Sequence, residues 1–214
     1  MPHTAPEGAA QPNVPRSRKG VETRARLVDA AKEVFEEHAF LEARISDIAK
    51  RARLSHGSFY HYFDSKEQIF REVAEREEEL LTAPPDDAHS ATRTQDSPRE
   101  RIRIANRRYL SRYRDESRIM GVIEQVSRYD DHVNEVRMTR MKHFAARSER
   151  AIRRWQRDGL VDPDIDPTIA ADALGAMVGR FAELWLVQGY REYDFDDAVE
   201  QLTALWANAL QLKD

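Results

Sequence analysis

Most of the chain repeats its apolar side chains at the spacing of an α-helix. Between residues 21 and 38 an apolar residue recurs every three or four positions, at Leu27, Ala30, Ala31, Val34 and Phe35. This spacing places these side chains on one face of a helix, because an α-helix has about 3.6 residues per turn. Alternating apolar and polar runs, which half-buried strands show, are almost absent. The pattern therefore predicts an all-α protein.

Helix start and stop residues divide the rest of the chain. We expect further helices over residues 45–52, 55–63, 65–81, 99–114, 116–128, 131–158, 166–188 and 194–212. Asp166 followed by Pro167 is a strong start signal, since Asp caps free N–H groups and Pro suits the first helical position. Gly159 and Gly189 follow two of these helices, as expected of C-terminal glycines.

Two segments lack this periodicity. Residues 1–15 are rich in Pro, Ala and Gly, and we expect a disordered tail. Residues 84–98 combine Pro with Asp, Ser and Thr, and we expect a flexible loop. The predicted organisation is a DNA-binding domain of three helices over 16–66 and a helical regulatory and dimerisation domain over 67–214.

Composition excludes several classes of protein. The chain has no cysteine, so disulfides and thiolate metal sites are impossible. We also find no nucleophile elbow, P-loop, dinucleotide fingerprint or Glu-x-x-His pair, and His56 and His61 have no third metal ligand nearby, so we expect no enzyme, no cofactor and no metal. No secretory signal or run of about 18 apolar residues is present, so we expect a cytoplasmic protein without a membrane partner.

The short helices over 45–52 and 55–63 are joined by a tight turn at Arg53 and Leu54, which indicates a helix-turn-helix. Its second helix fits the major groove of DNA, which is about 12 Å wide. We expect His56, Ser58 and His61 to read bases and Gly57 to allow close approach of the DNA. Phe59 and Phe63 should face inward and hold the helix on its scaffold.

Other side chains of this module suit contacts to phosphates. We expect Ser55 to cap the recognition helix, Tyr60 and Tyr62 to donate hydroxyls, and Lys66 to act as a phosphate clamp. The alternative is that the tyrosines belong only to a packed aromatic cluster. Although the net charge is −4, two basic groups flank the module, at Arg16, Arg18, Lys19, Arg24 and Arg26 and at Arg44, Lys50, Arg51 and Arg53. The start of the first group, from Arg16 to Lys19, either follows the minor groove or the backbone of the DNA or is a solvated arm.

The chain resembles the TetR family of transcriptional regulators. The resemblance covers residues 21–70 and rests on Ile48-Ala49 and Ser55-x-Gly57-Ser58-Phe59-Tyr60-x-Tyr62-Phe63-x-Ser65-Lys66-Glu67. It implies an operator of double-stranded DNA as partner. Two positions depart from the pattern: Arg44 stands where a neutral Thr or Ser caps the second helix, and Arg53 stands where the turn usually has Gly. A non-Gly residue costs roughly 1 kcal/mol in the turn if its φ is positive.

Dimerisation follows from the resemblance and from two apolar stripes in the last two helices. The stripes are Ala171, Gly175 and Gly179, and Leu202, Leu205, Trp206 and Ala209. We expect a homodimer through these helices, which would place two recognition helices on two half-sites. The alternative is that both stripes pack inside one chain.

The resemblance also implies a cavity for a small effector in the middle helices. The candidate lining residues are Arg108, Tyr109, Tyr113, Met120, Ile123, Glu124, Met141, Phe144, Met177, Phe181 and Trp185. For each residue, packing in the core is the alternative role. The predicted function is a ligand-responsive, dimeric regulator, a repressor that a small apolar or amphipathic effector releases from a near-palindromic operator. The alternative is a helical adaptor or an architectural DNA-binding protein without an effector.

Overall fold

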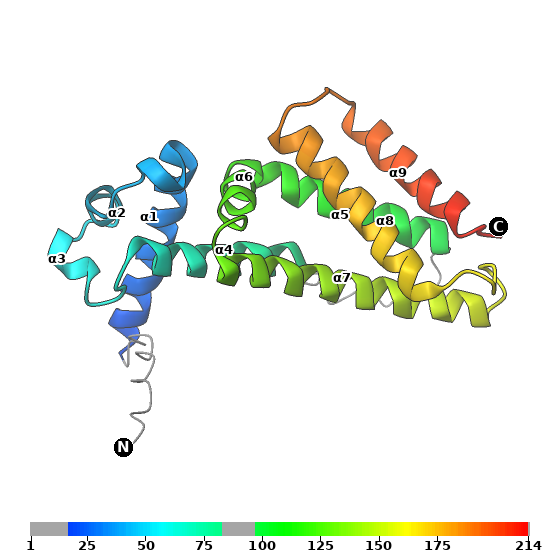
Figure 1. Ribbon diagram of the computed structural model, residues 1–214, viewed down its shortest axis with the longest axis horizontal. Helices are drawn as coiled ribbons and strands as arrows, with labels where there is room; N and C mark the ends of the chain where they lie inside the picture. The colour runs from blue at the N-terminus through cyan, green and yellow to red at the C-terminus, as the bar shows by residue number, and fades with distance from the viewer. Residues whose placement is uncertain (1–16, 83–96, 214) are drawn as a thin grey trace, which may run out of the picture. The chain divides into compact units, whose positions relative to one another are not determined.

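The computed structural model describes residues 17–82 and 97–213, and all regular elements in these ranges are helical (Figure 1). The elements are α1 Arg18–Glu42, α2 Ile45–Arg51, α3 His56–Phe59, α4 Lys66–Thr82, α5 Pro98–Asp115, α6 Ser117–Val126, α7 Asp131–Arg157, α8 Pro167–Ala182, the π-helix η2 Glu183–Val187 and α9 Phe195–Ala209. The all-α prediction is confirmed. The tail predicted over 1–15 and the loop over 84–96 lie outside the described residues, and the last part of that predicted loop is the start of α5.

The chain forms two compact units that divide within α4, between Val73 and Ala74. The predicted domain boundary at Lys66 therefore lies near the start of α4, whose first two turns belong to the first unit. Phe70 explains this division, because its ring packs 4.9 Å from that of Phe35 in α1. The start of α4 is thus part of the first unit's core.

The first unit is built on α1, which Ser17 caps by accepting a hydrogen bond from the Gly20 N–H at 3.1 Å. The predicted end of this helix at His38 coincides with a kink at Ala39, whose φ is 56° and ψ 176°. The chain then resumes a helical turn to Glu42. Phe35, Phe40 and Phe70 pack together behind this kink, with ring centroids 4.9 to 5.8 Å apart.

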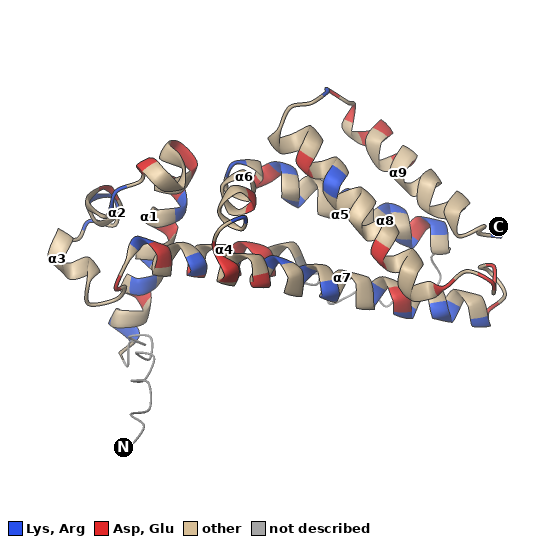
Figure 2. Cartoon of the chain, viewed as in Figure 1, with Lys and Arg blue, Asp and Glu red and all other residues tan. Residues whose placement is uncertain are grey.

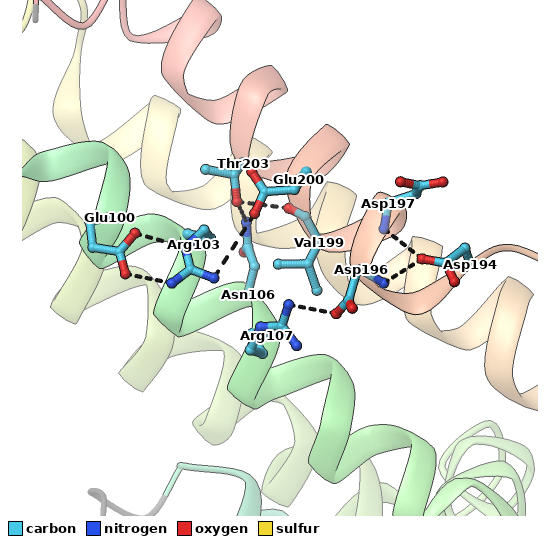
Figure 3. Close-up of polar contacts among 10 residues, drawn as sticks. All are labelled: Glu100, Arg103, Asn106, Arg107, Asp194, Asp196, Asp197, Val199, Glu200 and Thr203. Carbon is cyan, nitrogen blue, oxygen red and sulfur yellow. Dashed lines mark hydrogen bonds and ion pairs between the residues drawn. The ribbon is translucent and has the colours of Figure 1, made fainter.

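The second unit is a helical bundle in which α7 packs along α8 and α5 packs along α9. Its helices begin as the sequence predicts. Side chains of Ser97, Asp130, Asp166 and Asp194 each accept hydrogen bonds from the first turn of the helix that follows. Figure 3 shows the α5–α9 contact, where the Asn106 amide donates to the Thr203 hydroxyl at 3.3 Å and Arg107 pairs with Asp196 at 2.6 Å.

The helix predicted over 166–188 is divided in two. It is α-helical to Ala182 and continues as the π-helix η2, and Gly189 then ends it with a φ of 60°. The η2 segment lies tightly against α6, since a Cβ built on Gly121 would come within 2.8 Å of a Val187 methyl group. The wider turns of a π-helix leave no period that could be read from the sequence.

None of the described helices is long and apolar enough to cross a membrane.

Candidate nucleic-acid interface and effector cavity

The turn between α2 and α3 uses a left-handed residue. Arg53 has a φ of 55°, and its N–H donates to the Lys50 carbonyl at 3.0 Å, while the Leu54 N–H donates to the Ala49 carbonyl at 2.9 Å. The strain that the sequence predicts for a non-Gly residue at this place is therefore present. The two hydrogen bonds close the C-terminal end of α2 and fix where α3 begins.

The recognition helix is shorter than predicted. Regular α-helix covers only His56–Phe59, where a helix over residues 55–63 was expected, and residues 60–62 form turns. The His61 N–H donates to the Ser58 carbonyl and the Tyr62 N–H to the Phe59 carbonyl, three residues back in each case. These tighter bonds end the helix before Phe63, which is 1% exposed and anchors the segment in the core.

The outer face of this segment is polar and open. Phe59 and Phe63 are buried as predicted, whereas His56, Gly57 and His61 are exposed and Tyr60 is 46% exposed. No heavy atom lies within 4 Å of a Cβ built on Gly57. The fold itself therefore does not require glycine at this position.

Two predicted contact residues already have partners inside the segment. The Ser55 hydroxyl caps α3 by accepting from the Ser58 N–H at 3.1 Å, which confirms its capping role. The Ser58 hydroxyl lies 2.7 Å from the Ser55 hydroxyl, so the two share a hydrogen bond. A half-buried Ser58 in the cap is less available to a base than the exposed histidines.

Unpaired positive charges lie along α2 and in the turn before α3. Arg44, Lys50 and Arg53 are exposed, and within the described ranges their side chains make no ion pair or hydrogen bond. Arg44 forms no side-chain cap for α2. Figure 2 shows that α3 carries no Lys, Arg, Asp or Glu, while Lys and Arg lie on α2 and in the turn. This arrangement suits contacts to phosphates beside a polar reading surface.

Lys66, the predicted phosphate clamp, is bound inside the chain in this structure. Its ammonium group donates to the carbonyls of Phe40, Leu41 and Ala43 at 2.8, 3.1 and 3.0 Å. It also lies 4.7 Å from the centre of the Phe40 ring. Because an ammonium group has three N–H donors, all of them are used. Lys66, which belongs to α4, holds the C-terminal end of α1, and the last turn of α1 has no basic residue of its own.

Arg24 has a structural role beyond the basic group in which its sequence position places it. Its guanidinium lies 4.2 Å from the centre of the Phe63 ring and 2.5 Å from the Glu72 carboxylate. It also donates to the Tyr62 carbonyl at 3.5 Å. These contacts brace the segment after α3 from α1. Nothing in the local sequence indicated this, because the partners are far apart along the chain.

The second unit encloses a cavity of about 790 Å³ between α5, α7 and α8. Five of the predicted ligand residues line it: Arg108, Tyr109, Tyr113, Met141 and Phe144. Burial raises the pKa of both tyrosine hydroxyls above the usual value. These hydroxyls therefore stay protonated and can donate hydrogen bonds into the cavity.

The other predicted ligand residues do not line this cavity. Met120 and Ile123 of α6 are buried in the hydrophobic core, at 2% and 0% exposure. Glu124 instead pairs with Arg128 at 2.6 Å on the same helix. Met177 lies on α8 outside the cavity lining.

Phe181 and Trp185 are also outside the cavity lining, and their rings pack with those of Tyr193 and Phe195. These side chains bury their apolar surface against neighbours that the sequence could not identify.

Several lining residues were missed. Those with notable chemistry are Asn106, Arg137, Arg140, Arg147, Arg154, Trp155, Glu183 and Trp206. Four of the arginines recur on α7 at intervals of three or seven residues, so they share one helix face with Met141 and Phe144. That repeated spacing of cations beside large apolar residues was a signal that could have indicated them.

The small-residue stripe of α8 lies along the cavity. Ala171, Gly175 and Gly179 all line it; Ala171 is buried, Gly179 is half-buried and Gly175 is exposed. On α9, Leu202 and Trp206 are buried within the chain, while Leu205 is 51% exposed. Ile169 of α8 is 69% exposed. Of the predicted α9 stripe, Leu205 and Ala209 are therefore exposed, and Ile169 is an exposed apolar residue of α8 that was not predicted.

Comparison with known proteins agrees with this geometry. The family described as bacterial regulatory proteins, tetR family, matches residues 27–73, which lie within the first unit. The uncharacterized HTH-type transcriptional regulator YdgC of Bacillus subtilis is 29% identical over 184 residues, covering 81% of this chain and 86% of YdgC. The probable acrEF/envCD operon repressor of Escherichia coli is 21% identical over 201 residues, covering 91% of this chain and 88% of that protein.

The fold agrees over both units. The crystal structure of the transcriptional regulator FadR from Bacillus subtilis, in complex with stearoyl-CoA, has a TM-score of 0.68 at 16% identity and covers 85% of this chain and 96% of FadR. At this identity the likeness concerns the fold alone. The matched helix-turn-helix and the similarity to YdgC show that the chain belongs to the TetR family of transcriptional regulators, a family of DNA-binding proteins and not of enzymes.

Proposed function

We propose that the protein is a dimeric repressor that binds a near-palindromic operator and is released from it by a small amphipathic effector. The observation that carries the proposal is the exposed polar face of α3 beside the unpaired Arg44, Lys50 and Arg53. Side chains on such a face can reach base edges, while the cations neutralise phosphates. The resemblance of the probable acrEF/envCD operon repressor supports repression as the direction of control.

On DNA, we assign base contacts to His56 and His61 and phosphate contacts to the hydroxyls of Tyr60 and Tyr62. The histidines and Tyr60 are exposed, and Tyr62 is half-buried. The short α3 limits how many base pairs one chain reads. Two copies on two half-sites would supply the missing contacts.

Pairing of two copies is supported by exposed apolar side chains on the last two helices. Ile169 of α8 and Leu205 of α9 are more than half exposed. Ala173 and Ala209, four residues after each of them, are also exposed. Each residue lies one helical turn from its neighbour, so each pair shares a helix face. We propose these faces, in place of the stripe at Ala171, Gly175 and Gly179, as the dimer surface.

Effector binding is supported by the cavity of about 790 Å³, which falls within the usual range of roughly 300–1,000 Å³ for ligand pockets. Its walls combine Met141, Phe144 and Trp155 with polar groups. FadR of Bacillus subtilis, which shares this fold, forms a complex with stearoyl-CoA, and this supports an amphipathic effector. The effector would favour a state of the dimer in which the two recognition segments no longer match the half-site spacing.

The test is a titration of the full chain against labelled duplexes that flank its own gene, at rising salt. We expect one fragment to bind preferentially, with affinity falling steeply as salt rises because counterions are released from the phosphates. Light scattering of the free protein should give the mass of a dimer. A protein with no preferred fragment, or a monomer at micromolar concentration, would contradict the proposal.

A further inference from the structure

Arg140 is a buried cation at the wall of the cavity. It extends from α7, is 8% exposed and lines the cavity of about 790 Å³. It also lines a second, smaller hollow of about 390 Å³, together with Glu75, Glu78 and Glu135. Arg140 therefore lies between an acidic hollow beside α4 and the main cavity.

Its ion pair with Glu78 of α4 is poorly satisfied. The Arg140 Nε lies 2.8 Å from Glu78 Oε2, yet the alignment of the two groups is not that of a hydrogen bond. Both Glu78 oxygens, Arg140 Nε and one Arg140 Nη have no hydrogen-bond partner among the described residues. Burial raises the pKa of Glu78 even though Arg140 and Arg137 oppose it. A buried ion pair without such bonds gains little over its desolvation cost.

The cavity offers further donors and few free acceptors. The Trp206 indole N–H is buried at the cavity wall and has no acceptor among the described residues. The hydroxyls of Tyr109 and Tyr113 lie close enough to Arg140 to interact with its charge. Of the two lining acids, Glu183 is already paired with Arg180 and accepts from Gln188 at 3.0 Å.

Positive charge also prevails around the whole lining. Its cations are Arg101, Arg108, Arg137, Arg140, Lys142, Arg147, Arg154 and Arg180, and its acids are Asp172 and Glu183. A ligand with an anionic group would meet a favourable potential on entering, whereas a cationic ligand would meet repulsion. The apolar walls would contact the rest of the ligand.

We propose that the cavity binds an amphiphile with one anionic group, a carboxylate or a phosphate ester, and that this group takes the place of Glu78 as the partner of Arg140. Guanidinium groups bind carboxylates and phosphates through two parallel hydrogen bonds, which the present pair with Glu78 lacks. Since Glu78 belongs to α4, the exchange would loosen a contact between α4 and α7. The proposal rests on the effector site of the proposed function and names the chemistry of its ligand.

The test uses the full chain without DNA and four probes with the same twelve-carbon tail: dodecanoate, dodecyl phosphate, dodecanol and dodecyltrimethylammonium. Binding is measured by calorimetry and by tryptophan fluorescence, since Trp155 and Trp206 line the cavity. We expect one or both anions to bind at least tenfold more tightly than the alcohol, and the cation to bind least. Equal affinities for anion and alcohol would overturn the proposal, and the two anions distinguish a carboxylate from a phosphate ester.

Variants locate the anionic group. Arg140→Gln should abolish the preference for the anion, whereas Arg150→Gln, an exposed arginine of the same helix outside the lining, should keep it. Glu78→Gln should bind the anion several-fold more tightly, because the competing charge is gone. An unchanged preference in Arg140→Gln, or weaker anion binding in Glu78→Gln, would refute the exchange.

Folding is checked separately by thermal unfolding. If Arg140→Gln does not fold, the Glu78→Gln variant and the four probes still decide the outcome. Anion binding that leaves the protein on its operator would count against the proposed release mechanism while leaving this inference intact.

Discussion

At the scale of single residues, the basic side chains near α3 divide into those that hold the fold and those that stay free. Lys66, Arg24 and Arg51 each bind partners within the first unit, Arg51 through Glu37 at 2.6 Å. Arg44 and Lys50 have no such partner in the described ranges. The sequence could not show this division, because the partners of the first group lie 14 to 48 residues away. Only the free cations should contribute to DNA affinity.

This division predicts opposite effects for two lysines. Lys66→Ala should lower the free energy of unfolding by roughly 2 kcal/mol, since three carbonyls, two of them in part-buried hydrogen bonds, lose a charged donor. Lys50→Ala should leave stability within about 0.5 kcal/mol and weaken binding to all duplexes alike. Urea unfolding and DNA titration of both variants check the pair. A stable Lys66→Ala that only lost DNA affinity would restore the phosphate-clamp interpretation.

The open space around Gly57 gives a second prediction for a single residue. Gly57→Ala should fold as well as the parent or slightly better, by up to about 1 kcal/mol, because nothing within the chain meets the added Cβ. The same methyl group should weaken DNA binding at least tenfold if the backbone approaches DNA at this point. The idea fails if Gly57→Ala binds the preferred duplex with parental affinity.

At the scale of elements, helix ends were predictable where a local residue fixes them. Asp166, Asp194 and Gly189 cap or end their helices as expected, since capping depends on neighbours within one turn. The length of α3 and the π-helix η2 were not predictable. Each depends on packing against distant parts of the chain. The burial of Phe63 in the core limits α3, and η2 packs closely against Gly121.

The close contact of α6 and η2 predicts that Gly121→Ala destabilises the protein by roughly 1–3 kcal/mol, the range for overpacking a core. Gly175→Ala is the matched control. It is also a helical glycine of the second unit, but its Cβ would meet nothing within 4 Å. Thermal unfolding should show a lower midpoint for the first variant alone. Equal midpoints would mean that the α6–η2 contact can move apart at little cost.

At the scale of the whole molecule, the two units carry different chemistry. The first presents a polar recognition segment with free cations, and the second has a cavity lined mainly by cations and apolar side chains. The sequence indicated both regions largely through its resemblance to a family, which is strongest in the first unit. Five of the eleven residues predicted to bind a ligand line the cavity, and its other lining residues were not among them, because the fold, and not spacing along the chain, brings α5, α7 and α8 together.

The proposed dimer predicts that Leu205→Arg shifts the protein to monomer, because a charge would replace an exposed apolar side chain at the centre of the pairing surface. Leu41→Arg makes the same change at a residue that is 69% exposed in the first unit and should leave the dimer intact. Light scattering at micromolar concentration checks both. Dimers of both variants would place the interface elsewhere.

The central claim, that the exposed face of α3 reads DNA sequence, is tested most directly by selection from random duplexes with the parent and with His61→Ala. We predict that both proteins select two half-sites with the same spacing, and that the variant loses its preference at one base pair in each half-site. Identical selected sites for both proteins, or no selected site for the parent, would contradict the claim.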